Sequence, residues 1–135
     1  MPIHLIPVCS PDYAQNHPPV KTPADVLAHN LIHADVGKQS TGEEWCGWMR
    51  GCGIDCPDKI LGISCHDPAL AMQTAADGLG LAIGYVELID ADLHSGKLVA
   101  AFEMTVQHQY SYYLVYNKTN QNKPKITEFH RWLLI

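Results

Sequence analysis

The sequence has few basic residues. Nine Lys and Arg stand against fourteen Asp and Glu in 135 residues, so the formal net charge at pH 7 is -5. A protein that neutralises many phosphates needs a basic face, and here only Lys118, Lys123 and Lys125 gather near one another. We therefore do not expect this chain to bind nucleic acid directly.

Long apolar runs are also missing. No stretch approaches the roughly 18 apolar residues of a membrane span, and the first nine residues lack the positive run of a secretory signal. Hydrophobic residues nevertheless make up 47% of the chain and charged residues 17%. We expect one packed, cytoplasmic domain without a membrane partner.

Patterns of the common catalytic sites are absent as well. Serines 10, 64 and 111 lack the flanking glycines of a hydrolase nucleophile. The Gly78-Leu79-Gly80 turn precedes a strand-like run, whereas a dinucleotide loop follows a strand and opens a helix. Met49 stands where a thioredoxin-like motif starting at Cys46 would need its second cysteine. The sequence predicts neither an enzyme nor a bound cofactor.

What the chain does contain is an alternation of short apolar runs with helix-start signals. Strands are expected at 5–9, 31–33, 60–64, 79–86, 98–102 and 111–116. Helices are expected after Thr22-Pro23, after a capping box from Thr41 to Glu44, after Asp67-Pro68, over 86–93 and over 124–135. The alternation predicts an α/β domain with a largely parallel sheet flanked by helices and a helix at the C-terminus.

One expected helix carries a clear apolar face. Trp45, Trp48, Met49 and Cys52 lie at i, i+3, i+4 and i+7, and Gly53 supplies a stop. We expect this face to pack against the sheet.

Three stretches resemble a known family. They are IPVCSP at 6–11 with PADVL at 23–27 and LIH at 31–33; DPALAMQTAADGLGLA at 67–82; and YYLV at 112–115 with KI at 125–126 and FHRWLL at 129–134. In this order and spacing the chain resembles the C-terminal half of LysR-type transcription regulators, especially the subgroup typified by the glycine-cleavage-system activator. The resemblance covers almost the whole chain.

The resemblance implies a type II periplasmic-binding-protein-like lobe, with residues 1–135 forming a truncated effector-binding domain. Residues of about 7–110 would form the second lobe. Residues 111–135 would form a crossing strand and a C-terminal helix that returns to a missing first lobe. The expected function is non-catalytic sensing of a small-molecule effector, with DNA contacted only through a missing winged helix-turn-helix. The alternative is a remnant of a truncated regulator that no longer senses.

The same resemblance places an effector near three segments: His33 and Asp35 after a strand; His66, Asp67 and Pro68 at a helix start; and Tyr112 on the crossing strand. A helix N-terminus favours an anion, so the expected effector is an amino acid or small organic acid. The alternative is that Asp67 only caps its own helix and Tyr112 fills the core.

The resemblance also implies a homodimer. In the family, the helix that matches 69–76 packs against the partner's first lobe. Contacts are therefore expected at Leu70, Met72 and Gln73, and the apolar C-terminal face with Phe129 and Trp132 needs a cover.

The cysteines support a competing hypothesis. Cys46, Cys52, Cys56 and Cys65 lie within one short region, where thiolates could bind zinc or sense redox state. They lack the paired C-x-x-C spacing of common zinc sites, and five cysteines do not suggest a disulfide framework. The alternative is that these thiols are small core residues in a reducing compartment.

Overall fold

The structure is a computed structural model that describes residues 1–34, 42–115 and 117–133. Its strands are β1 (Pro2–Cys9), β2 (Leu31–Ala34), β3 (Ile63–Cys65), β4 (Leu81–Tyr85), β5 (Val99–Ala100) and β6 (Val106–Ser111). Its helices are α1 (Pro11–Asn16), α2 (Glu43–Gly51), α3 (Pro68–Ala76), α4 (Asp90–Ser95) and α5 (Pro124–Leu133), with 3-10 turns η1 (Pro23–Ala28) and η2 (Lys118–Asn120).

The described strands form one sheet in the order β3-β2-β4-β1-β5, and β6 also pairs with β1. β2 is parallel to β3 and to β4. β1 is antiparallel to β4, β5 and β6, so within the described chain it alone runs against the other five strands. The expected α/β fold is therefore confirmed, and its sheet is mixed, because the three pairings made by β1 are antiparallel and the two made by β2 are parallel.

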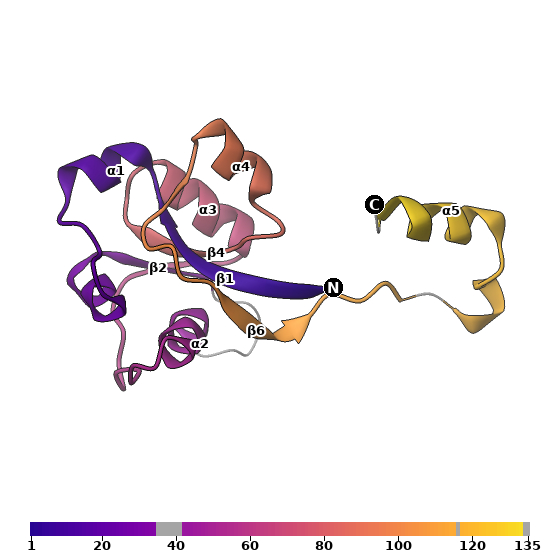
Figure 1. The fold of residues 1–135 in the computed structure, drawn as a ribbon, viewed down its shortest axis with the longest axis horizontal. Helices are drawn as coiled ribbons and strands as arrows, with labels where there is room; N and C mark the ends of the chain where they lie inside the picture. Colours follow the sequence, from indigo (N-terminus) through magenta and orange to yellow (C-terminus); the bar gives the residue numbers. More distant parts are fainter. Residues whose placement is uncertain (35–41, 116, 134–135) are drawn as a thin grey trace.

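Helices cover both faces of this sheet, with α3 and α4 on one side and α2 on the other (Figure 1). Strand residues alternate between the two layers, as the pleat requires. In β1, Leu5 and Cys9 pack toward α2, whereas Ile6 and Val8 pack toward α3 and α4. Burial on both faces explains why the central strands are almost continuously apolar.

Helix α2 contributes the largest side chains of the core. Trp45, Trp48 and Met49 are fully buried, which confirms the apolar face that the spacing predicts. The indole N–H of Trp45 donates to the Ile32 carbonyl at 3.0 Å, and that of Trp48 donates to the Met104 carbonyl at 2.9 Å. Both indoles are thus buried with their polar atoms satisfied.

The start of α2 differs from the expected capping box. The helix begins at Glu43, and its N-cap is Gly42 in the left-handed region, with φ of 89° and no side-chain cap hydrogen bond. Thr41, the expected cap, lies outside the described residues. The stop after α2 is as expected, because Gly53 has a φ of 82°.

Three expected elements are misplaced. The strand expected at 60–64 is the three-residue edge strand β3, with Leu61 75% exposed ahead of it, so the expectation of a buried strand is wrong. The strand expected at 111–116 is found instead at Val106–Ser111, because only that segment lies beside β1 for backbone pairing. The helix expected at 86–93 begins later, at Asp90, after a turn.

Helix α5 stands apart from the sheet at the end of an extended segment (Figure 1). Phe129, Trp132 and Leu133 are exposed on it. None of the helices in the described part of the chain has the length and apolar content needed to cross a bilayer.

Candidate ligand-binding groove

A groove of about 390 Å³ lies where β6 and the segment after it face the end of β4 and the start of α3. Residues from four parts of the chain line it: Ile3, Pro68, Tyr85, His108, Tyr110, Ser111 and Tyr112. Four of these side chains are aromatic or imidazole rings, so the groove offers flat faces for stacking together with polar edges for hydrogen bonds.

The rings are positioned by the alternation of side chains along an extended chain. His108, Tyr110 and Tyr112 are alternate residues along β6 and its continuation. The His108 ring centroid lies 5.3 Å from that of Tyr110 and 6.0 Å from that of Tyr85 on β4. His108 thus lies between Tyr85 and Tyr110 in a row of three neighbouring rings along one side of the groove.

The His108 ring is oriented by a hydrogen bond that its Nδ1 accepts from the backbone. The Tyr110 backbone N–H donates to His108 Nδ1 at 2.9 Å. Burial lowers the pKa of His108, although the nearby Glu43 carboxylate opposes this shift. A neutral imidazole that accepts at Nδ1 carries its proton on Nε2. The ring can therefore offer an N–H to a ligand oxygen.

Tyr85 connects the groove to helix α2. Its hydroxyl donates to the Glu44 carboxylate at 2.7 Å. Burial, and then the negative charge of Glu44, raise the pKa of Tyr85 far above its usual value. The phenol thus stays protonated, and α2 has a direct contact with the wall of the groove.

The start of α3 supplies Pro68. Asp67 is the N-cap of this helix, and its carboxylate accepts from the Leu70 backbone N–H at 2.8 Å. Asp67 therefore occupies the capping role that the sequence offers as the alternative to ligand contact.

The predicted effector residues do not all meet in the groove. Pro68 and Tyr112 line it, and Tyr112 is 47% exposed. His66 and Asp67 are exposed beside the α3 start and are not among the lining residues. Asp35 lies outside the described residues.

His33 is placed elsewhere, inside the core. It is only 2% exposed on β2, and its Nε2 lies 3.5 Å from the Leu61 carbonyl oxygen. Its Nδ1 has no hydrogen-bond partner within the described part of the chain. A direct contact between His33 and a ligand in this groove is not supported by this position.

A second cavity, of about 400 Å³, lies between α3 and α4 and shares Pro68 and Tyr85 with the groove. Met72 and Gln73, two of the predicted dimer contacts, line it. Leu70, the third on this helix, is 46% exposed. The dimer contacts themselves stay predictions.

The cysteines do not form the hypothesised metal site. Cys46 and Cys56 are joined in a disulfide, and Cys52 and Cys65 carry free thiols. Among the residues that the structure describes, no three His, Cys, Asp or Glu side chains come together as metal ligands. The four-cysteine metal hypothesis is therefore wrong, and the structure adds a pairing of Cys46 with Cys56 that the sequence does not predict. The turn at Gly53 reverses the chain and returns Cys56 to α2, which linear spacing does not reveal.

Sequence reasoning missed His108, Tyr110 and Tyr85 as groove residues. A signal was present for the first two, because aromatic rings alternate with Gln107, Gln109 and Ser111 over residues 106–112. Such a two-residue period is typical of a strand with one functional face. Tyr85 could not be predicted in this way, because it reaches the groove through the pairing of β1 with both β4 and β6.

The mixed sheet with helices on both faces defines a fold like that of type II periplasmic binding proteins. Residues 1–134 match the LysR substrate binding domain, and the chain belongs to this family. Solved structures of similar fold include the effector domain of the transcriptional regulator AmpR of Pseudomonas aeruginosa. The TM-score is 0.75 at 22% identity, over 99% of this chain and 61% of that one. An effector binding domain from Citrobacter freundii has a TM-score of 0.73 at 26% identity, over 96% of this chain and 62% of that one.

Curated relatives include the transcriptional regulator DsdC of Escherichia coli, 33% identical over 96% of this chain and 42% of the relative. The glycine cleavage system transcriptional activator of the same species is 28% identical over 97% of this chain and 41% of the relative. The chain thus spans about two-fifths of the length of these relatives, all of which are described as regulators of transcription.

Proposed function

We propose that this chain is the effector-sensing part of a LysR-type transcription regulator and works without catalysis. The observation that carries the proposal is the groove formed by Tyr85, His108, Tyr110 and Tyr112 beside the paired strands β1 and β6. Contact with DNA would require a winged helix-turn-helix outside this chain. The regulators among its relatives and the family match support a cytoplasmic site of action.

The proposed ligand is an amino acid or small organic acid. The neutral imidazole of His108 and the tyrosine hydroxyls can donate to carboxylate or hydroxyl oxygens, and the rings can stack on a planar or apolar part. Ligand binding would favour one arrangement of the lobes over another, and this difference in affinity would shift the population of the regulator.

A panel of amino acids and small organic acids, screened by thermal melting and followed by calorimetry, tests this function. We expect one compound to raise the melting temperature, and His108→Ala to weaken its binding about tenfold because a buried hydrogen bond is lost. His94→Ala is the matched control, since His94 is exposed on α4. Equal affinity in the His108→Ala variant would place the ligand elsewhere, and a panel without any binder would count against sensing by this chain.

We further propose a homodimer in which the exposed face of α5 and the Leu70 side of α3 are covered. Exposed Phe129 and Trp132 lie with ring centroids 5.8 Å apart and form an apolar surface of the kind that marks an interface. Sedimentation equilibrium should show a dimer, and Trp132→Glu should shift it toward monomer, whereas Thr119→Glu, on the exposed η2 turn, should not. A wild-type chain that stays monomeric at all concentrations would refute the dimer.

A further inference from the structure

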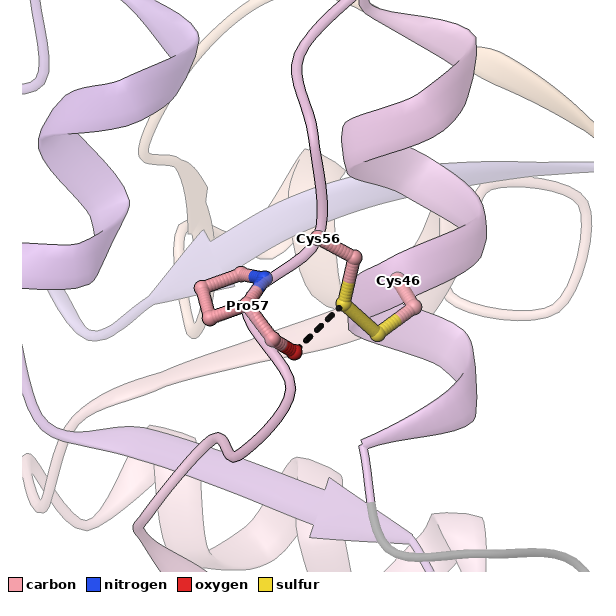
Figure 2. Close-up of a disulfide and its surroundings, with 3 residues drawn as sticks. All are labelled: Cys46, Cys56 and Pro57. Carbon is pink, nitrogen blue, oxygen red and sulfur yellow. Dashed lines mark hydrogen bonds between the residues drawn. A yellow bond between two sulfur atoms is a disulfide. The ribbon is translucent and has the colours of Figure 1, made fainter.

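The disulfide between Cys46 and Cys56 joins the middle of α2 to the segment that follows this helix (Figure 2). The two residues are ten positions apart, and their Cα atoms lie 5.1 Å apart. Both residues are half-buried rather than enclosed in the core, unlike Cys9 and Cys65. We propose that this pair is a reversible redox modification site, oxidised by low-molecular-weight disulfides, that controls how firmly α2 supports the ligand groove.

The pair is chemically distinct from the other thiols. Cys9 is fully buried, and burial raises the pKa of its thiol to about 11. Burial also raises the pKa of Cys52, and Cys65 lies buried beneath α3. Burial shields Cys9 and Cys65 from an oxidant, and the raised pKa of Cys52 lowers the fraction of its attacking thiolate.

The surroundings of Cys56 also suit the reduced state. Its Sγ lies 3.4 Å from the Pro57 carbonyl oxygen (Figure 2). A disulfide sulfur has no proton to donate, but the reduced thiol can donate its S–H to this oxygen. The reduced Cys56 thiol therefore has an acceptor beside it that the disulfide does not use.

Helix α2 is the connection between this pair and the groove. Two residues before Cys46, the Glu44 carboxylate accepts from the Tyr85 hydroxyl in the groove wall at 2.7 Å. Two residues after Cys46, Trp48 donates to the Met104 carbonyl, immediately ahead of β6 with its row of rings. A restraint on α2 thus acts on both walls of the groove, and its removal by reduction loosens them.

The reaction balances as an ordinary thiol–disulfide exchange. One cysteine thiolate attacks a sulfur of the small disulfide and displaces one thiolate, leaving a mixed disulfide. The second cysteine thiolate then attacks the protein sulfur of that mixed disulfide and displaces the second small thiolate. Two protein thiols are oxidised by two electrons, and one small disulfide becomes two thiols, which take up the two protons. A dithiol reverses both steps.

In a reducing compartment the pair would rest as thiols, so the disulfide would form only when small disulfides accumulate. The redox site itself does not depend on the proposed sensing function, whereas its effect on ligand affinity does. The test therefore uses measurements on the ligand-free protein.

The wild-type chain is equilibrated in buffers of reduced and oxidised glutathione, and its mass and backbone hydrogen exchange are followed. We expect reversible conversion between dithiol and disulfide, and a fall in melting temperature of about 5–10 °C on reduction. Amide exchange in α2 and β6 should speed up on reduction. Cys52→Ser should behave as wild type, and Cys46→Ser should not respond.

Three results would overturn the proposal. The reduced chain could fail to close the pair in oxidising buffer, or Cys52→Ser could abolish the response, which would mean a different pairing. Equal rates of amide hydrogen exchange in α2 and β6 in both redox states would show that the disulfide does not affect the groove. Failure to find an effector would leave all three readouts intact, so the two proposals fail separately.

Discussion

Trp48→Ala is expected to lower the free energy of unfolding by roughly 3–5 kcal/mol, as for other fully buried aromatic residues. The side chain packs edge-to-face against Trp45 and Phe102, with ring centroids 6.1 Å away in each case. Its loss leaves a cavity between α2 and the sheet, and it leaves the Met104 carbonyl without its indole donor. Urea unfolding followed by circular dichroism measures the change.

Trp132→Ala, measured at a protein concentration low enough to dissociate the proposed dimer, is the matched control for this substitution. Trp132 is 67% exposed on α5 of the single chain, so its removal should then change the unfolding free energy by less than about 1 kcal/mol. Comparable losses for the two tryptophans at that concentration would mean that α5 packs on the body of the protein. If Trp48→Ala does not fold, Trp48→Phe keeps an aromatic ring and should show an intermediate loss.

Gly80→Ala is expected to destabilise the sheet by about 1–3 kcal/mol through overpacking. A Cβ at this position would lie 2.3 Å from the Asn30 carbonyl oxygen, which is backbone and cannot rotate away. That carbonyl accepts from the Leu81 N–H at 2.8 Å, where β4 first meets β2. Relief of the clash must therefore separate two paired strands at the centre of the sheet, and thermal melting should record the loss.

Gly47→Ala is expected to change the stability of the same chain in the opposite direction. Gly47 lies inside α2, and the nearest atom to an added Cβ is Leu5 Cδ1 at 3.9 Å, an ordinary contact. Alanine there should stabilise the protein by about 0.5–1 kcal/mol, because glycine loses more backbone entropy in a helix. If both substitutions destabilise equally, the close approach at Gly80 is not the cause.

Sequence patterns locate the central elements of this fold well because those elements are apolar on their own. The runs at 5–9, 31–33 and 79–86 correspond to β1, β2 and β4, and Asp67-Pro68 starts α3 as expected. Strand β6 is different, since most of its residues are polar and only pairing with β1 makes it a strand. Tyr112 and Tyr113 favour extended structure in isolation, but strand propensity needs a neighbouring strand to satisfy the backbone.

The residues of the candidate groove were hard to predict for the same reason, because the sequence does not show which strands pair. Pro68 and Tyr112 could be chosen from the family resemblance, whereas Tyr85 and His108 meet through strand order. His33 follows a strand, as expected, but its side chain turns into the core. The Cys46–Cys56 pairing likewise depends on a chain reversal after α2 rather than on spacing.

The antiparallel contact between β1 and β6 also determines where the chain enters and leaves this unit. The register pairs Pro2 with Ser111, and the Tyr112 N–H donates to the Met1 carbonyl, so the two ends of the compact part lie side by side. A unit whose ends are adjacent can be grafted into a loop of a host protein without stretching either partner. Residues 1–112 therefore have the geometry needed for insertion into a loop of a reporter protein. The signal of that reporter would then respond to ligand binding in the groove.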